Sequence, residues 1–233
     1  MANAASVEYS AACCEVFNSD LYNGSNIHMN SKFFDLKKEK QDRMINAALK
    51  IFALRGYRHA STDDIVREAA ISKGLLFHYF KSKLGVYDFI YDYSVRYMIL
   101  ELRSNVDSKE KDLFEVMKQI ERARMHAMRG YPYMQQFLNR SMAEDVSEAL
   151  LAIEEKRGSL EETADAIYSQ VDFSQLPPEI DGEKLRKMLD FTIKGLMTER
   201  FQDASFQPEM LYEEVCDYLD MMKKIVYRTT YSS

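Results

Sequence analysis

The residues whose types and spacing best suit chemistry lie between Ser61 and Lys83, in the segment STDDIVREAAISKGLLFHYFKSK. Three serines, Ser61, Ser72 and Ser82, each precede an apolar helical pattern, where a hydroxyl can cap free backbone N–H groups. Asp64 follows Ser61 by three residues, the spacing of a second capping side chain. The segment therefore predicts two short helices joined by a tight turn and followed by a third helix. An exposed second helix after such a turn is the geometry that enters a DNA major groove.

Other kinds of site chemistry lack a motif in this sequence. There is no nucleophile elbow, no glycine-rich phosphate loop and no paired histidine–carboxylate motif. The histidines and cysteines are scattered, without the spacing of a zinc site or a disulfide framework. They are His28, His59, His78, His126, Cys13, Cys14 and Cys216. The sequence predicts no catalytic residue, no metal and no cofactor, and it favours a reducing cytoplasm.

The composition favours a helical protein with a real core. Of the 233 residues, 46% are hydrophobic and 29% charged, which excludes a disordered chain. Only 4 prolines and 8 glycines are present beside 14 methionines, which favours helices over a β-sandwich. No apolar run approaches about 18 residues, so no membrane span and no membrane partner are expected.

The charge of the chain is unevenly distributed. Residues 32–87 carry 12 Lys and Arg against 6 Asp and Glu, so the rest of the chain, from totals of 31 and 37, carries 19 against 31. One basic block on an acidic body is typical of a DNA-binding head joined to a domain that does not bind DNA. The overall charge of −6 would have argued against nucleic acid.

Helical periodicity predicts an all-α fold of about nine helices and no strand. Residues 1–31 are aperiodic and are interpreted as a flexible tail; a DNA-searching arm is the alternative, disfavoured because no Lys or Arg precedes Lys32. Gly56 is expected to end the first helix, and Gly158 is a possible kink. The predicted helices cover about 36–54, 61–70, 72–80, 82–105, 109–129, 132–143, 145–170, 181–203 and 208–228.

The basic block resembles the DNA-binding head of the TetR/AcrR family of bacterial regulators. The resemblance covers about 50 residues, and it rests on residues that match the family pattern in register: Gly56, Tyr57, Thr62, Ile65, Ala69, Ser72, Lys73, Gly74, Leu76, Tyr79, Phe80, Ser82 and Lys83. Three departures stand out. Ala70 replaces a usual glycine, which costs on the order of 1 kcal/mol if φ is positive there. Phe77 replaces a usual tyrosine, and Leu84-Gly85 replaces a common glutamate and its neighbour.

The resemblance implies roles for individual residues. Ser61, Thr62 and the first amides of their helix would bind phosphate, and Tyr79 and Lys83 would clamp the DNA backbone. The recognition helix would address the major groove through the residues that begin it and face outward: Ser72, Lys73, Gly74, Leu75, Phe77 and His78. Phe77 suits a core position almost equally well, and His78 suits a merely exposed one.

The resemblance also implies a plan for the whole chain. It comprises the tail 1–31, a helix-turn-helix domain 32–83, and an effector-binding and dimerisation domain 84–233 whose first helix is the linker. Helices 181–203 and 208–228 would form the homodimer on a palindromic operator in double-stranded DNA. A small-molecule effector of unknown identity would lie among aromatic and methionine side chains, each of which also suits the core: Tyr93, Tyr97, Met117, Met125, Met134, Phe137, Tyr168 and Phe191. The expected function is a ligand-responsive regulator, most often a repressor in this family; the alternative is a ligand-independent adaptor whose body binds a protein.

Overall fold

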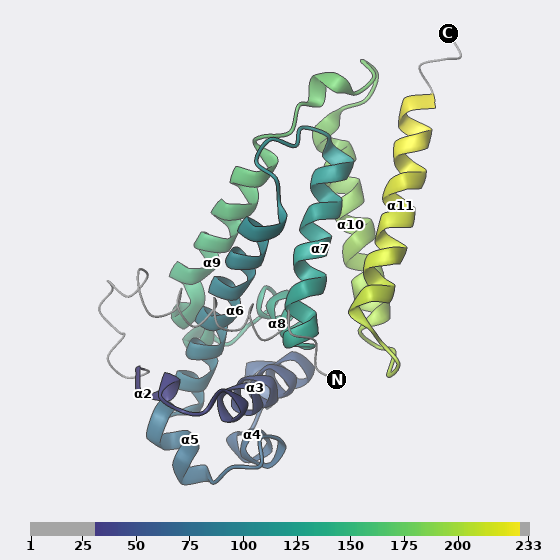
Figure 1. The fold of residues 1–233 in the computed structure, drawn as a ribbon. Coiled ribbons are helices and arrows are strands. Elements are labelled where there is room, and N and C mark those ends of the chain that lie inside the picture. The colour runs from purple at the N-terminus through teal and green to yellow at the C-terminus, as the bar shows by residue number, and fades with distance from the viewer. Residues whose placement is uncertain (1–30, 229–233) are drawn as a thin grey trace.

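The computed structural model describes residues 31–228, which form ten α-helices and one short 3₁₀ helix, with no strand in that range. Figure 1 shows helices α2 to α5 gathered at one end of the molecule and the long helices α6, α7, α9, α10 and α11 extending away from that end. The helices are α2 (Ser31–Phe34), α3 (Lys38–His59), α4 (Thr62–Glu68), α5 (Lys73–Phe80), α6 (Lys83–Asn105), α7 (Leu113–Gly130), α8 (Met134–Ser141), α9 (Ser147–Tyr168), η2 (Phe173–Gln175), α10 (Gly182–Arg200) and α11 (Pro208–Arg228).

The all-α prediction is confirmed, and each of the nine predicted helices has a counterpart. Gly56 has φ 66° inside α3, so the first helix changes direction where a glycine end was expected. Helix α9 continues through Gly158, and the possible kink there was wrong. The sequence reasoning missed α2 and η2. Apart from Ser31, which begins α2, the predicted tail lies outside the described residues.

The head, which we define as α2 to α5, shares its core with the helices above it. Helix α3 packs against α4, α6 and α8, and its residues Leu49 and Phe52 are buried. One continuous cluster of buried residues runs from Phe33 in α2 to Ile153 in α9. The head therefore shares one hydrophobic core with the helices that follow it, and the domain boundary after residue 83 stays a prediction.

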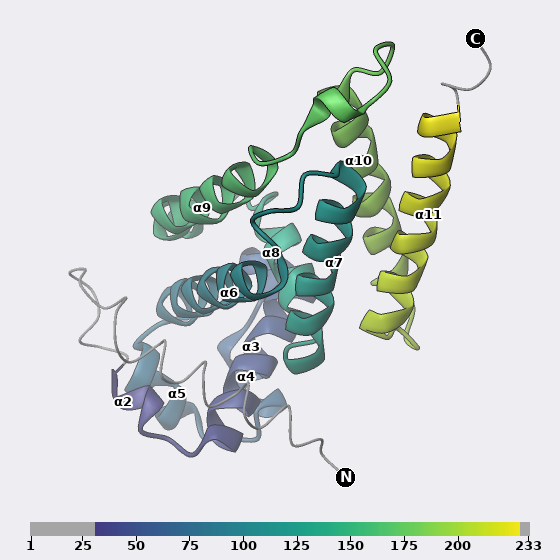
Figure 2. The ribbon, with the colours of Figure 1, turned by 45° about the horizontal axis from the view of Figure 1, so that its top comes forward.

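The body, which we define as α7 to α11, joins the head through α6. Helix α6 packs against both α7 and α9, which explains the apolar residues on both of its faces. A second core lies between α7, α10 and α11, with Phe114, Leu189 and Val215 among its buried residues. Figure 2 shows α10 and α11 beside α7, on the side of the molecule away from α2 and α9.

Candidate nucleic-acid interface

The three predicted capping serines begin helices as expected. The hydroxyl oxygens of Ser61, Ser72 and Ser82 accept backbone N–H bonds of 3.1, 3.2 and 3.0 Å from the amides two or three residues ahead. Asp64 does not take the expected second capping position. Its carboxylate pairs with Arg67 at 3.1 Å and with an arginine of α3. The caps fix where α4, α5 and α6 begin.

The turn between α4 and α5 contains the residue that departs from the family pattern. Ala70 has φ 51°, the left-handed conformation that glycine adopts at least cost. The Ala70 amide donates to the Arg67 carbonyl (3.2 Å) and the Ile71 amide to the Val66 carbonyl (3.1 Å). This is the hydrogen-bond pattern of a Schellman helix end with alanine in the glycine position. The turn keeps its geometry and carries the strain of the extra methyl group.

The turn between α5 and α6 is equally tight. Lys81 has φ 63°, a second non-glycine residue in the left-handed region. A Cβ atom on Gly85 would lie 2.0 Å from the carbonyl oxygen of Phe80, so no other residue fits there without moving the backbone. The departure at position 85 thus has a structural reason. The close approach holds the end of α5 against the start of α6.

The outer face of α5 carries the residues predicted to address bases. Lys73, Gly74 and His78 are exposed, and Leu75 and Phe77 are half-buried. A Cβ atom on Gly74 would have no neighbour within 4 Å, so the backbone at this position of α5 is open. A donor-bearing, open face on a rigid short helix can approach base edges closely.

The start of α4 is linked to this face through Asp63. Thr62 is half-buried at the first position of α4. Lys73 Nζ lies 2.8 Å from Asp63 Oδ1, with both side chains more than half exposed. Such a solvated ion pair contributes about 0–1 kcal/mol, so a phosphate can compete for the lysine. The pairing brings the first turns of α4 and α5 to one surface.

The two predicted backbone clamps are less accessible than the sequence suggested. The Tyr79 ring is 8% exposed and packs edge-on against Phe33 at 5.8 Å. Lys83 Nζ donates to the carbonyl oxygens of Tyr57 (2.9 Å) and Ala60 (3.4 Å) and lies 4.2 Å from the Tyr57 ring centroid. Its ammonium thus holds the end of α3 to the start of α6. The clamp role of both residues stays a prediction.

A polar joint that sequence reasoning missed ties the head to α9. The Tyr57 amide donates to Glu144 Oε2 (3.1 Å) and the Tyr57 hydroxyl to Glu148 Oε1 (2.6 Å). Arg58 Nη2 lies 3.2 Å from Asp145 Oδ2. Burial and the neighbouring glutamates raise the pKa of the Tyr57 hydroxyl, which keeps it a donor. The partners are about 90 residues apart in sequence, and no local signal could have found them.

None of the eight predicted effector residues lines the groove between α6 and α9. Six of them are buried or partly buried against neighbouring helices. The ring of Tyr168 lies under the Arg186 guanidinium, with 4.7 Å between the guanidinium carbon and the ring centroid. Phe191 is 62% exposed on α10. The six are Tyr93, Tyr97, Met117, Met125, Met134 and Phe137. The helical spacing of these six residues matches the faces on which their helices pack. The effector role of all eight residues stays a prediction.

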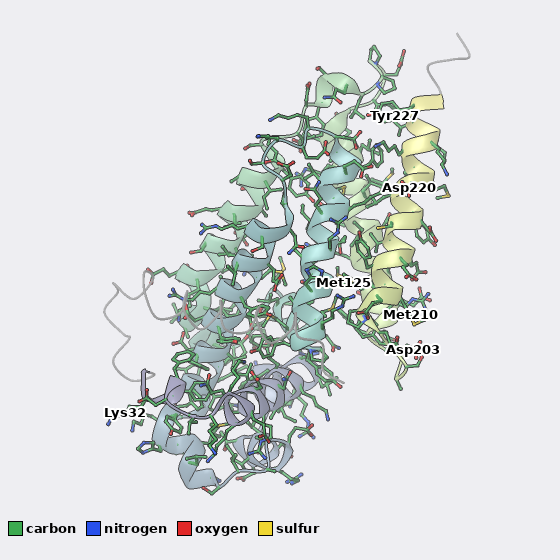
Figure 3. All side chains as sticks on the ribbon, viewed as in Figure 1. Lys32, Met125, Asp203, Met210, Asp220 and Tyr227 are labelled. Carbon is green, nitrogen blue, oxygen red and sulfur yellow. The ribbon has the colours of Figure 1, made fainter. Side chains whose placement is uncertain are left out.

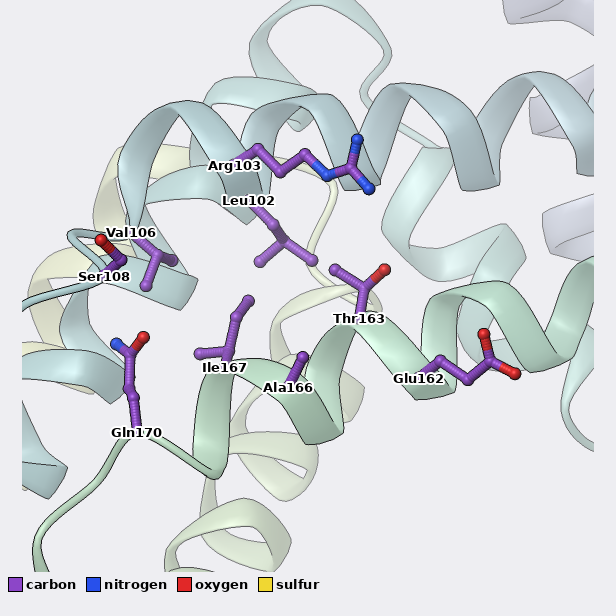
Figure 4. Close-up of a pocket in the computed structure, with 9 residues that line it drawn as sticks. All are labelled: Leu102, Arg103, Val106, Ser108, Glu162, Thr163, Ala166, Ile167 and Gln170. Carbon is purple, nitrogen blue, oxygen red and sulfur yellow. The ribbon is translucent and has the colours of Figure 1, made fainter. Parts of the chain in front are cut away.

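An open groove lies between the end of α6 and the second half of α9 (Figure 4). This groove has a volume of about 460 Å³. Its floor is apolar and its rim polar, with Arg103 and Glu162 facing it from opposite helices. Neither of these two side chains has an ion pair within the part of the chain that the structure describes. The remaining lining residues are Leu102, Val106, Ser108, Thr163, Ala166, Ile167 and Gln170.

Two further features bear on the kind of site. Between residues 31 and 228, no group of three or more His, Cys, Asp or Glu side chains is arranged to hold a metal ion. Among the same residues, no helix has the length and apolar character needed to cross a bilayer.

Comparison with known proteins agrees with this geometry. Residues 44–88 match the model of the bacterial regulatory proteins of the tetR family. The uncharacterized HTH-type transcriptional regulator YuxN of Bacillus subtilis (strain 168) is 39% identical over 75 residues, which cover 30% of this chain and about a quarter (25%) of that protein.

Two solved structures share the fold. A TetR family transcriptional regulator from Chloroflexus aurantiacus J-10-FL has a TM-score of 0.58 at 19% identity, covering 86% of this chain and 97% of its own. The transcriptional regulator FadR from Bacillus subtilis, in complex with stearoyl-CoA, has a TM-score of 0.53 at 17% identity, covering 76% and 96%. At such identities the likeness concerns the fold alone.

The capped α4–turn–α5 unit and the all-helical body define a helix-turn-helix DNA-binding protein. Residues 44–88 match the head of the bacterial regulatory proteins of the tetR family, and the chain has the fold of the solved TetR family transcriptional regulators.

Proposed function

We propose that the chain is a cytoplasmic, ligand-responsive repressor that binds a palindromic operator as a homodimer and leaves it when a small molecule binds the body. The observation that carries the DNA-binding half is the open outer face of α5, with Lys73, Gly74 and His78 exposed. One such face spans only a few base pairs. Two copies related by a two-fold axis would read adjacent major grooves about one helical turn apart.

Exposed apolar side chains on α10 and α11 support the dimer. Phe191 and Met188 on α10 are 62% and 48% exposed, and Ile225, Met221 and Tyr218 on α11 are 53%, 47% and 40% exposed. Large apolar residues concentrated on two neighbouring helices are typical of an interface that is covered in the assembly. We therefore assign Phe191 to this face rather than to an effector pocket. A helical bundle across the two-fold axis would bury them.

The groove between α6 and α9 is our candidate effector site. Its volume of about 460 Å³ lies within the range of small-molecule sites, and its apolar floor with a few polar rim groups is typical of them. The FadR relative in fold was crystallised with an amphipathic ligand, stearoyl-CoA. We propose an amphipathic effector, with its apolar part along the floor and its polar part near Arg103 or Glu162.

The two ends of α9 suggest how the effector would act. The second half of α9 lines the groove, and its first residues reach the head through the Tyr57–Glu148 hydrogen bond. A ligand that prefers a wider groove would move α9 relative to α6 and shift the head that both helices contact. The ligand changes the free-energy difference between the two arrangements by the difference between its binding free energies for them. A ligand that binds both arrangements equally would therefore leave DNA affinity unchanged.

Selection from random DNA duplexes tests the first half of the proposal. We expect an inverted repeat, bound by two chains as measured by light scattering, and a weaker complex for Lys73→Ala. Recovery of no sequence, or of a single half-site bound by one chain, would refute it.

A small-molecule thermal-shift screen tests the second half, with Ala166→Trp as the blocked control because position 166 lines the groove floor. A true effector should raise the melting temperature of the wild type, fail to do so in the variant, and lower DNA affinity. Absence of any such compound, together with a helical body that captures a protein, would favour the ligand-independent adaptor.

A further inference from the structure

The short helix α2 lies against the recognition helix, although nothing in the family pattern required it. Phe33 is fully buried, and its ring centroid lies 5.8 Å from Tyr79, 5.4 Å from Phe80 and 5.0 Å from Phe89. Tyr79 and Phe80 belong to the last turn of α5. Figures 1 and 2 both show α2 at the flank of α5.

A second anchor fixes α2 to α3. The side-chain amide of Gln41, itself 6% exposed, donates to the carbonyl oxygens of Phe34 (3.0 Å) and Leu36 (2.7 Å). The Leu36 amide also donates to the Phe33 carbonyl at 3.2 Å, which closes the turn after α2. Because the Phe33 ring is buried and the Gln41 side chain of α3 donates to the carbonyl oxygens of Phe34 and Leu36, the α2 backbone is held beside α5.

Lys32 is the charged residue that this arrangement displays. It precedes the buried Phe33, is exposed, and points from the head into solvent at the edge of the molecule (Figure 3). Within residues 31–228 it has no ion pair, unlike Lys38, Lys50 and Lys73 of the same head. The exposed carboxylate of Asp35 lies one turn away in sequence without pairing to it. A lysine on a fixed backbone, with no carboxylate paired to it among residues 31–228, can neutralise an external anion.

We propose that Lys32 is an additional DNA-binding residue, which α2 places against a backbone phosphate beyond the segment contacted by α4 and α5. This inference rests on the proposed binding of an operator by a dimer. Figure 1 shows α2 and α11 on opposite sides of the molecule. In a dimer formed through α10 and α11, the two Lys32 residues would therefore contact the two outer ends of the operator. The bound DNA would be longer than the α4–α5 units alone require.

The test is the salt dependence of binding by full-length Lys32→Ala to the selected operator. Each phosphate neutralised contributes about 0.9 to the slope of log affinity against log salt, so losing two contacts lowers the slope by about 1.8. Between about 50 and about 200 mM salt, the wild type should therefore lose on the order of tenfold more affinity than the variant. Ethylation of the outermost phosphates should weaken the wild type and not Lys32→Ala. Lys32→Arg should retain the wild-type slope.

Two controls keep the outcome unambiguous. Lys109→Ala removes an exposed lysine from the α6–α7 connection, far from the head, and should leave the slope unchanged. Lys73→Ala should weaken binding through α5. A wild-type slope for Lys32→Ala, beside a weakened Lys73→Ala, overturns the role of Lys32 and leaves the proposed function standing. Absence of DNA binding by the wild type overturns both.

Discussion

Replacing Ala70 with glycine should stabilise the protein, because the turn between α4 and α5 holds an L-residue at φ 51°. The left-handed conformation costs an alanine about 1–2 kcal/mol relative to its ordinary backbone, a cost that glycine does not bear. Glycine in turn loses more backbone entropy on folding, by about 0.5–1 kcal/mol. Ala70 is exposed, so removing its methyl group sacrifices no buried contact. The net gain is about 0.5–1 kcal/mol.

The gain can be measured by urea and thermal denaturation followed by circular dichroism. For a chain of this length, about 1 kcal/mol corresponds to about 2–4 °C in the melting temperature. The helix and turn hydrogen bonds should remain, so DNA affinity should be unchanged.

The neighbouring alanine provides a matched control. Ala69 has φ −74° and is 1% exposed, so Ala69→Gly adds backbone entropy loss and removes a buried methyl group. It should destabilise the protein by about 1–2 kcal/mol. Lys81→Gly, at φ 63°, should stabilise as Ala70→Gly does. A neutral or destabilising Ala70→Gly beside a destabilising Ala69→Gly would refute the strain argument.

Three further predictions concern the body and its joint with the head. Phe191→Glu places a charge on the proposed dimer face and should shift sedimentation toward the monomer with little change in helix content; an unchanged dimer would argue against that face. Tyr57→Phe removes the 2.6 Å hydrogen bond to the exposed Glu148 and should lower the unfolding free energy by about 1 kcal/mol, with Glu148→Ala adding little to it in a double-mutant cycle. Additive losses would contradict the joint. Acid should loosen α11 from α7. Burial alone would raise the pKa of the Glu115 carboxyl, but hydrogen bonds from lysine side chains outweigh burial and lower this pKa. A hydrogen bond from a lysine likewise lowers the pKa of Asp220. Carboxyl groups with lowered pKa values stabilise the fold above their ordinary values, so stability should hold from neutral pH to about pH 5 and fall below about pH 4. A urea midpoint that stays constant across that range would contradict this.

The sequence determined the features that depend on neighbouring residues. Ser61, Ser72 and Ser82 cap the helices they precede, because a cap needs only a side-chain oxygen and the next few amides. The long helix after Ser82 ends at Asn105, as predicted. The strain at Ala70 was also foreseeable, since the turn requires one residue in a left-handed conformation whatever packs around it.

Only the tertiary structure decided which partner each exposed or buried side chain meets. Lys83, expected on DNA, bonds to carbonyl groups at the end of α3 because the start of α6 packs there. Phe33, in a segment with too few residues to show helical periodicity, is buried among aromatic rings 46 or more positions away. Phe191 shares the apolar spacing of core residues but lies exposed on α10. Periodicity identifies an apolar face, but the element that covers it is set by contacts between distant segments, whose pairing no local pattern encodes.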